Sequence, residues 1–133
     1  MNRALLALLG KVIRHARRVR RELGPGHVES VYHRALLHSL RESGAAGLDR
    51  PRLRVRYEGR VVGEVVPDLL VRLPNGHAVL VECKSAGRFE QADFDQLRRY
   101  LRAYDHEAIG LLLGFGGERL EFRRVSLQER VKS

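Results

Sequence analysis

Apolar residues recur at three- and four-residue steps along the first forty residues, which is the period of an amphipathic helix. This spacing predicts a helix over residues 3–22 with an arginine-rich outer face, ended by the glycine-proline-glycine sequence at 24–26. A second helix is predicted over residues 27–42. Its expected buried residues are Val28, Val31, Ala35, Leu36 and Leu40. Residues 44–50 are the only linker-like segment.

The apolar period changes to two from Arg52 onward, as in half-buried strands. Strands are predicted over residues 52–57 and 60–66, and the second is expected to run on to Leu73. The chain then predicts a strand over 77–84, a helix over 89–104, a buried strand over 108–115 and a last strand over 118–125. This order predicts one α/β domain of mixed α+β character over residues 1–133, made of the basic helix 3–22, a core at 23–125 and a short tail at 126–133.

Turn chemistry in the middle of the chain fixes how two strands pair. Pro74, Asn75 and Gly76 fit a three-residue hairpin loop with the glycine in the left-handed position. In this register Asp68 lies opposite Glu82, and the two faces of the hairpin segregate cleanly. One face is apolar and carries Leu69, Val71, Leu73, Val79, Val81 and Cys83. The other face carries Asp68, Glu82 and Lys84.

Two carboxylates opposite each other on a hairpin repel unless a cation lies between them. Mg²⁺ suits that position, because it is commonly held by one or two carboxylates together with water and phosphate oxygens. Lys84 is close enough in sequence to orient a water molecule or to stabilise developing charge. An ordinary salt-bridged surface patch, with Lys84 paired to Glu82 or Asp68, is equally consistent with this short pattern.

Composition adds a strong positive charge. The chain carries a formal net charge of +9, with 22 arginines and 3 lysines, which favours planar contacts to phosphate or carboxylate. This charge indicates a polyanionic partner, although coding bias and solubility would produce the same excess of arginine. In the first helix the basic side chains could follow a phosphate backbone, lie on an anionic membrane surface or be solvated, and we favour nucleic acid. These side chains are Arg14, Arg17, Arg18, Arg20 and Arg21.

No segment has the roughly 20 apolar residues that a membrane span requires, so we expect a soluble protein. The single cysteine, Cys83, excludes an intramolecular disulfide, fits a small core residue and agrees with the reducing cytoplasm. The histidines lack paired metal-ligand spacing, so zinc is not expected.

Further motifs carry a family resemblance. The sequence from Gly26 to Tyr32, GHVESVY, places Glu29 and Tyr32 on one helix face and resembles the GxxExxY proteins, a branch of the PD-(D/E)XK nuclease superfamily. Downstream, Pro67-Asp68 and Glu82-Cys83-Lys84 match the superfamily signature. Residues 96–100, QLRRY, resemble the QxxxY element of its exonuclease-like branches. The resemblance covers residues 23–122, and four motifs in order are more specific than any one of them.

This resemblance implies a restriction-endonuclease-like core, in which a central mixed β-sheet is flanked by helices, preceded here by the extra N-terminal helix. It implies that Asp68, Glu82, Glu29 and the backbone carbonyl of Cys83 hold Mg²⁺ or Mn²⁺, and that Lys84 assists the attacking water. Gln96 and Tyr100 would steady phosphate or the site. Tyr32 and Tyr100 are equally consistent with core aromatics whose hydroxyl groups are satisfied.

The leading hypothesis is a metal-dependent nuclease that hydrolyses phosphodiester bonds of nucleic acid, with DNA as the expected substrate. A homodimer would suit cutting of both strands by so small a chain. The first alternative is a non-catalytic nucleic-acid-binding or assembly module that retains the nuclease fold. The second is a structural domain whose basic helix docks an acidic protein.

Overall fold

The computed structural model describes residues 2–127, so residues 128–133 of the predicted tail lie outside the described part. Three helices and seven strands follow one another along this range. The helices are α1 (Arg3–Leu23), α2 (Glu29–Glu42) and α3 (Gln91–Ala103). The strands are β1 (Ala46–Asp49), β2 (Leu53–Tyr57), β3 (Arg60–Val65), β4 (Leu69–Arg72), β5 (Ala78–Lys84), β6 (Ala108–Gly114) and β7 (Glu121–Val125).

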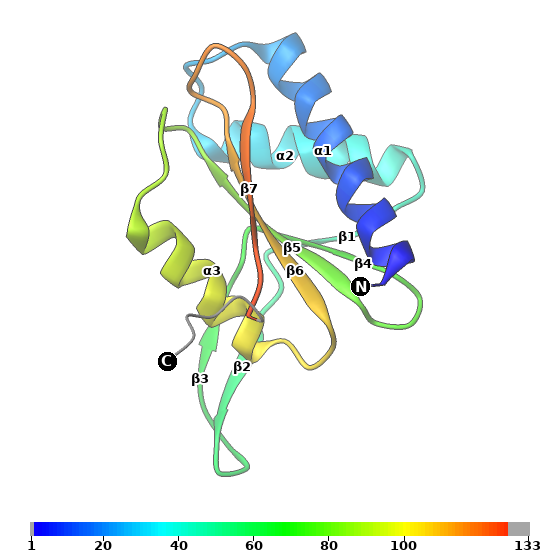
Figure 1. The fold of residues 1–133 in the computed structure, drawn as a ribbon, viewed down its shortest axis with the longest axis vertical. Coiled ribbons are helices and arrows are strands. Elements are labelled where there is room, and N and C mark those ends of the chain that lie inside the picture. The colour runs from blue at the N-terminus through cyan, green and yellow to red at the C-terminus, as the bar shows by residue number, and fades with distance from the viewer. Residues whose placement is uncertain (1, 128–133) are drawn as a thin grey trace.

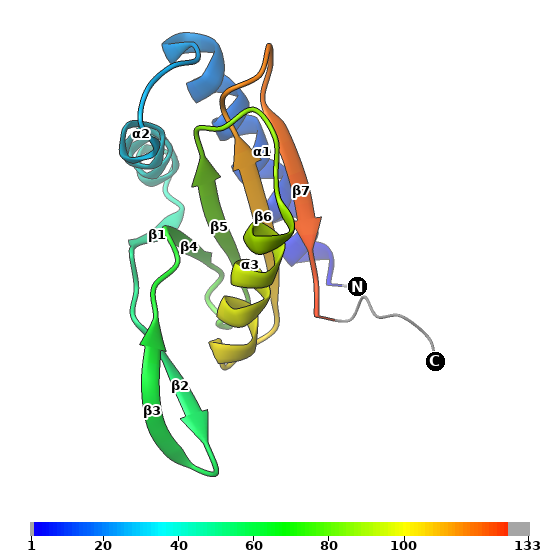
Figure 2. The same cartoon turned by 90° about the vertical axis from the view of Figure 1, so that its left-hand side faces the viewer.

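Five strands form a mixed sheet in the order β1-β4-β5-β6-β7, and β2 and β3 form a separate hairpin. Only β5 and β6 pair in parallel within the described sheet, since the other three pairs are antiparallel. Helices α1 and α2 cover one face, α3 covers the other, and the β2–β3 hairpin projects from the body of the molecule (Figures 1 and 2). The predicted mixed sheet flanked by helices is therefore confirmed.

Alternation along the central strands supplies two apolar cores, one on each side of the sheet. Odd-numbered residues of β4 and β5, such as Val71 and Val79, pack with α1 and α2. Even-numbered residues, such as Leu70 and Leu80, pack with α3 through Leu97 and its neighbours. Because both faces are covered, β5 is buried along almost its whole length.

The predicted β4–β5 register is confirmed. Leu69 pairs with Val81 and Val71 with Val79. The loop closes as expected, because Gly76 adopts φ +95° and donates its N–H to the carbonyl of Leu73 at 2.9 Å. Continuing this register places Asp68 opposite Glu82, at the end of the hairpin away from the turn.

Two predictions about strand continuity are wrong. The strand expected over residues 60–73 is broken at Pro67, so that β3 and β4 belong to different sheets. Proline has no N–H to donate to a strand ladder, and it ends the hairpin before the chain enters the central sheet. Residues 44–50 are not merely a linker, because they contain β1, which forms an edge of the sheet by pairing with β4.

Helix and strand boundaries differ in detail from the predictions. Helix α2 begins at Glu29 rather than residue 27, so Val28 is its N-cap and is 66% exposed instead of buried. The last strand begins at Glu121 rather than residue 118. No helix within residues 2–127 is long and apolar enough to cross a bilayer.

Close packing of α3 on β6 makes Gly110 a sensitive position. A Cβ atom there would lie 2.7 Å from Cγ of the buried Leu97, whereas a Cβ at Gly63 of β3 would have no neighbour within 4 Å. We expect Gly110→Ala to lower the free energy of unfolding by about 1–3 kcal/mol, because α3 must shift away from the sheet. Urea denaturation would check this, with Gly63→Ala as the nearly neutral control; equal losses in the two variants would contradict the packing.

Candidate active site

Asp68 and Glu82 are locked together where the β4–β5 hairpin opens. The backbone N–H of Asp68 donates to Oε1 of Glu82 at 2.8 Å, and the backbone N–H of Cys83 donates to Oδ2 of Asp68 at 2.8 Å. Continuing the register would place Cys83 opposite Pro67, but the N–H of Cys83 donates to the Asp68 carboxylate. Each acid therefore has one oxygen fixed by backbone and one, Oδ1 of Asp68 and Oε2 of Glu82, without a hydrogen bond inside the described range.

Burial makes this carboxylate pair electrostatically costly. Glu82 is 4% exposed. Burial, and next the negative charge of Asp68, raise the pKa of Glu82 from its ordinary 4.5 to about 8. The backbone hydrogen bond and the charge of Lys84 oppose the shift without cancelling it. A cation beside the two acids would relieve the repulsion and favour the ionised form.

Lys84 is held by acids from two elements. Its Nζ lies 3.9 Å from Oε2 of Glu82, 3.5 Å from Oδ1 of Asp93 and 3.5 Å from Oε1 of Gln96. Burial by itself lowers the pKa of Lys84, but Glu82, Asp93 and Glu29 outweigh it, so the pKa lies above its ordinary value. Lys84 is therefore a fixed ammonium group at neutral pH, able to donate hydrogen bonds and unable to serve as a base.

Glu29 reaches the same end of β5 from the first turn of α2. Its Oε2 accepts a hydrogen bond from the backbone N–H of Ser85 at 3.2 Å. The charge of Glu29 also raises the pKa values of both Glu82 and Lys84. Sequence positions 29, 68, 82 and 84 are thus brought together from three separate segments. Within residues 2–127, however, no three His, Cys, Asp or Glu side chains form a group that could hold a metal ion by themselves.

The predicted supporting residues divide into two environments. Gln96 and Tyr100 come from α3 and face the acids. Burial, and then the charges of Glu82 and Asp68, raise the pKa of Tyr100 above its ordinary value, so its hydroxyl stays protonated. Tyr32 is fully buried instead: it stacks on Phe115 at 4.3 Å between ring centroids, and its hydroxyl donates to the carbonyl of Gly24 at 2.7 Å. Tyr32 thus holds the turn that leads into α2.

The structure does not bring the basic residues of α1 to the acids. Helix α1 packs on the face of the sheet opposite α3. Arg14, Arg17, Arg18 and Arg21 are exposed there. Arg18 pairs with Glu22 at 3.0 Å. Arg20, expected among the outer arginines, is buried and donates to the carbonyl of Gly117.

Asp93, which lies beside Lys84, was not among the candidate residues predicted from the sequence. The signal was local, because Glu90 and Asp93 form a capping box at the start of α3, in which each side chain accepts a hydrogen bond from the other residue's backbone N–H. The spacing of Glu90 and Asp93 is visible in the sequence. The proximity of Asp93 to Lys84 is not, because it depends on how α3 packs on the sheet.

The donor set suits a hard divalent ion. Two carboxylate oxygens are free of backbone bonds, and the charged form of the buried Glu82 is destabilised by the negative charge of Asp68. Mg²⁺ is usually held by one or two carboxylates, with waters and substrate phosphate oxygens completing its shell. Two protein carboxylates are therefore sufficient, and a cluster of three is not required.

Comparison with known proteins agrees with this geometry. Residues 7–125 match the PD-(D/E)XK nuclease superfamily. The chain belongs to this superfamily. Among solved structures, the crystal structure of SSO0001 is similar to it, with a TM-score of 0.54 and 20% identity, over 72% of this chain and 49% of that protein. The chain thus spans about half the length of SSO0001, and the likeness establishes a shared fold. No curated protein matches the chain.

Superfamily membership gives the sheet and helices their name, a restriction-endonuclease-like fold. PD-(D/E)XK nucleases generally use divalent metal ions such as Mg²⁺ and act on nucleic acid.

Stability of the metal-free protein should depend on pH through Glu82. Because its pKa is raised from 4.5 to about 8, the folded state holds more protons than the unfolded state between these values, and Glu82 lowers stability as pH rises through this window. Glu82→Gln removes the titration, so its free energy of unfolding should exceed that of the wild type by about 1 kcal/mol or more at pH 8, and the difference should vanish near pH 4.

Urea denaturation in EDTA at several pH values measures this difference. The exposed Glu42 at the end of α2 supplies the control, since Glu42→Gln should follow the wild-type curve. A Glu82→Gln difference that stays constant with pH would show that Glu82 ionises normally.

Proposed function

We propose that the chain is a Mg²⁺- or Mn²⁺-dependent nuclease that hydrolyses phosphodiester bonds of nucleic acid, with DNA as substrate. The observation that carries this proposal is the pair formed by the buried Glu82 and the partly exposed Asp68, in which backbone N–H groups fix one oxygen of each acid and leave the other without a backbone hydrogen bond. Keeping two repelling carboxylates together inside a protein destabilises it, and a cation required for function explains why they are there.

In this proposal Asp68 and Glu82 hold the metal ion, with the backbone carbonyl of Cys83 and the carboxylate of Glu29 completing the protein's share of the site. When bound, the metal ion would polarise the phosphate and lower the pKa of a water molecule. Glu29 also fixes the chain just past β5, because it accepts the N–H of Ser85. Asp68 and Glu82 are positioned by backbone, so little reorganisation is needed at the moment of reaction.

Lys84 has two roles in this proposal: it positions the attacking water and it neutralises negative charge on the phosphate. Its ammonium group is oriented by Glu82, Asp93 and Gln96, and its raised pKa keeps it charged. It can therefore hold the attacking water by donating a hydrogen bond and stabilise negative charge that develops on the phosphate. The protonated hydroxyl of Tyr100 is a second donor on the same side, and Gln96 keeps Lys84 aligned.

We also propose a subfamily, a domain organisation, an oligomeric state and a cellular location for the chain. We place the chain in the GxxExxY branch, supported by Glu29 near the acids and by Tyr32, which is buried against Phe115 and holds the turn before α2. We treat residues 1–133 as one catalytic domain, and a second copy is the proposed means of cutting both strands. Its one cysteine, buried as Cys83, supports a cytoplasmic location.

Cleavage assays with Mg²⁺ or Mn²⁺ on single- and double-stranded DNA and RNA test the proposal. Glu82→Ala and Lys84→Ala should each lower the cleavage rate by at least about 100-fold, because the first removes a metal ligand and the second removes the cation that stabilises charge on the phosphate. Lys84→Ala should still bind metal and DNA, since both carboxylates remain. Glu42→Ala, an exposed acid outside the site, should cut like the wild type.

Cleavage by Lys84→Ala at the wild-type rate would reject the role given to Lys84. Wild-type protein that binds nucleic acid but leaves all four substrates intact would favour the non-catalytic module instead.

A further inference from the structure

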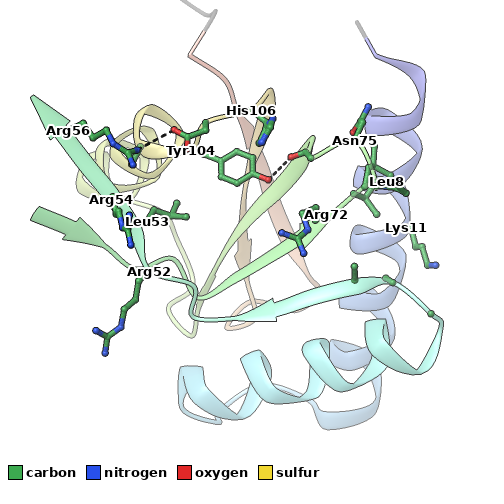
Figure 3. Close-up of a pocket in the computed structure, with 18 residues that line it drawn as sticks. Leu8, Lys11, Arg52, Leu53, Arg54, Arg56, Arg72, Asn75, Tyr104 and His106 are labelled. Atoms are coloured by element: carbon green, nitrogen blue, oxygen red, sulfur yellow. Dashed lines mark hydrogen bonds and ion pairs between the residues drawn. The ribbon is translucent and has the colours of Figure 1, made fainter. Parts of the chain in front are cut away.

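A cleft of about 1080 Å³ lies at the end of the sheet away from the candidate active site. Figure 3 shows its walls: β2 on one side, α1 on another, and the β4–β5 turn with the segment after α3 above. Strand β5 starts at Ala78, beside this turn, and ends at Lys84 in the active site. The two features therefore lie at opposite ends of one strand.

The cleft is strongly basic. The cations that line it are Lys11, Arg52, Arg54, Arg56 and Arg72, and Asp105 is the one acid among its described lining residues. Arg56 lies 3.8 Å from Asp105, and Arg52 lies 3.8 Å from Glu64 in a pair exposed to solvent. Within residues 2–127, the other three cations form no ion pair within 4.0 Å. Their charge is thus available to an anion.

The sequence of the hairpin explains how the arginines line up. Leu53 of β2 packs into the core beneath α3. Arg54 and Arg56 alternate with apolar positions, and Arg52 directly precedes the strand. Arg52, Arg54 and Arg56 all line the cleft and so form a row of positive charge along it, although the β2–β3 pairing shifts register between Val55 and Arg56. Like charges at neighbouring positions repel one another. A repeating anion suits such a row better than a single phosphate does.

The cleft and the acids lie at the two ends of β4, with the protein core between them. Arg72 is exposed at the cleft and Asp68 directly precedes the strand, whereas Leu70 between them is 1% exposed because it packs beneath α3. A nucleic acid chain that reaches both features must therefore pass around α3 or the β2–β3 hairpin.

We propose that this cleft binds the phosphate backbone of the substrate away from the cleaved bond, through the unpaired Arg54 and Arg72 and through Arg52, whose pair with Glu64 is exposed to solvent. The proposal rests on the proposed function for its choice of nucleic acid. Arginine presents a planar donor group that bonds two phosphate oxygens at once, which fits the near absence of lysine here. The contact is to backbone and therefore independent of base sequence.

Binding of a fluorescein-labelled 30-base-pair DNA duplex, followed by anisotropy in EDTA between 50 and 200 mM NaCl, tests this cleft without cleavage. Replacing Arg52, Arg54 and Arg72 by serine together should weaken binding at least about tenfold, and the slope of log K against log salt should fall by roughly two to three. The matched control replaces Arg3, Arg34 and Arg124 by serine, which are exposed arginines outside the cleft. It should weaken binding no more than about twofold.

Replacing Arg52, Arg54 and Arg72 by lysine keeps the positive charge, so this variant should keep most of the slope of log K against log salt. Thermal unfolding of each variant checks the fold, and Arg72→Ser alone should reduce the slope by about one if the triple variant is unstable. Wild-type affinity and slope in the serine variant, or an equal loss in the control, would overturn the proposal.

Cleavage of the same duplex by wild-type protein with Mg²⁺ is measured separately. If the wild-type protein cleaves the duplex but the serine variant binds it with unchanged affinity, the proposed role of the cleft is contradicted and the nuclease activity is not. If the serine variant binds more weakly but the wild-type protein does not cleave, the proposed nuclease activity is contradicted and the role of the cleft is not.

Discussion

Two hydrogen bonds between backbone and carboxylate, one from Asp68 to Glu82 and one from Cys83 to Asp68, hold the candidate site together. They form just past the last residue pair of the β4–β5 ladder, Leu69 and Val81, where each carboxylate accepts a backbone N–H from the facing segment. The result is a pair of negative groups fixed close together with little solvent around one of them. The raised pKa of Glu82 follows from that geometry, and a cation beside the two acids would lower it. Lys84, Glu29 and Tyr100 are arranged around this pair.

The turn at Pro74, Asn75 and Gly76 sets the register on which the pair depends. A slip of one residue would move Glu82 to the apolar core beneath α1 and α2 and bring Cys83 to the α3 side in its place. Packing on both faces of the hairpin opposes such a slip, because it would exchange residues that fit two different cores, such as Val81 and Leu80. The chemistry at one end of the hairpin is thus fixed by the turn at the other. Covering both faces of the sheet with helices also keeps Glu82 away from water.

Sequence could predict the hairpin and the acids because both depend on local information, namely turn residues and a period of two. Strand β1 escaped prediction, since Ala46–Asp49 has no pattern of its own and becomes a strand only by pairing with β4. The break between β3 and β4 was visible in Pro67. Asp93 reaches Lys84 only through the docking of α3, and Arg72 joins the arginines of β2 only through the path of the chain between the two sheets. Such relations depend on tertiary structure, which no local pattern encodes.

Diffraction from crystals soaked in Mn²⁺, at a wavelength where manganese scatters anomalously, tests the central claim most directly. The account predicts one strong anomalous peak bonded to Oδ1 of Asp68 and Oε2 of Glu82, at metal–oxygen distances of about 2.0–2.3 Å. The peak should be lost in Glu82→Ala crystals. A wild-type map with no peak between these two acids, or with manganese bound elsewhere while the acids keep their metal-free positions, would contradict it.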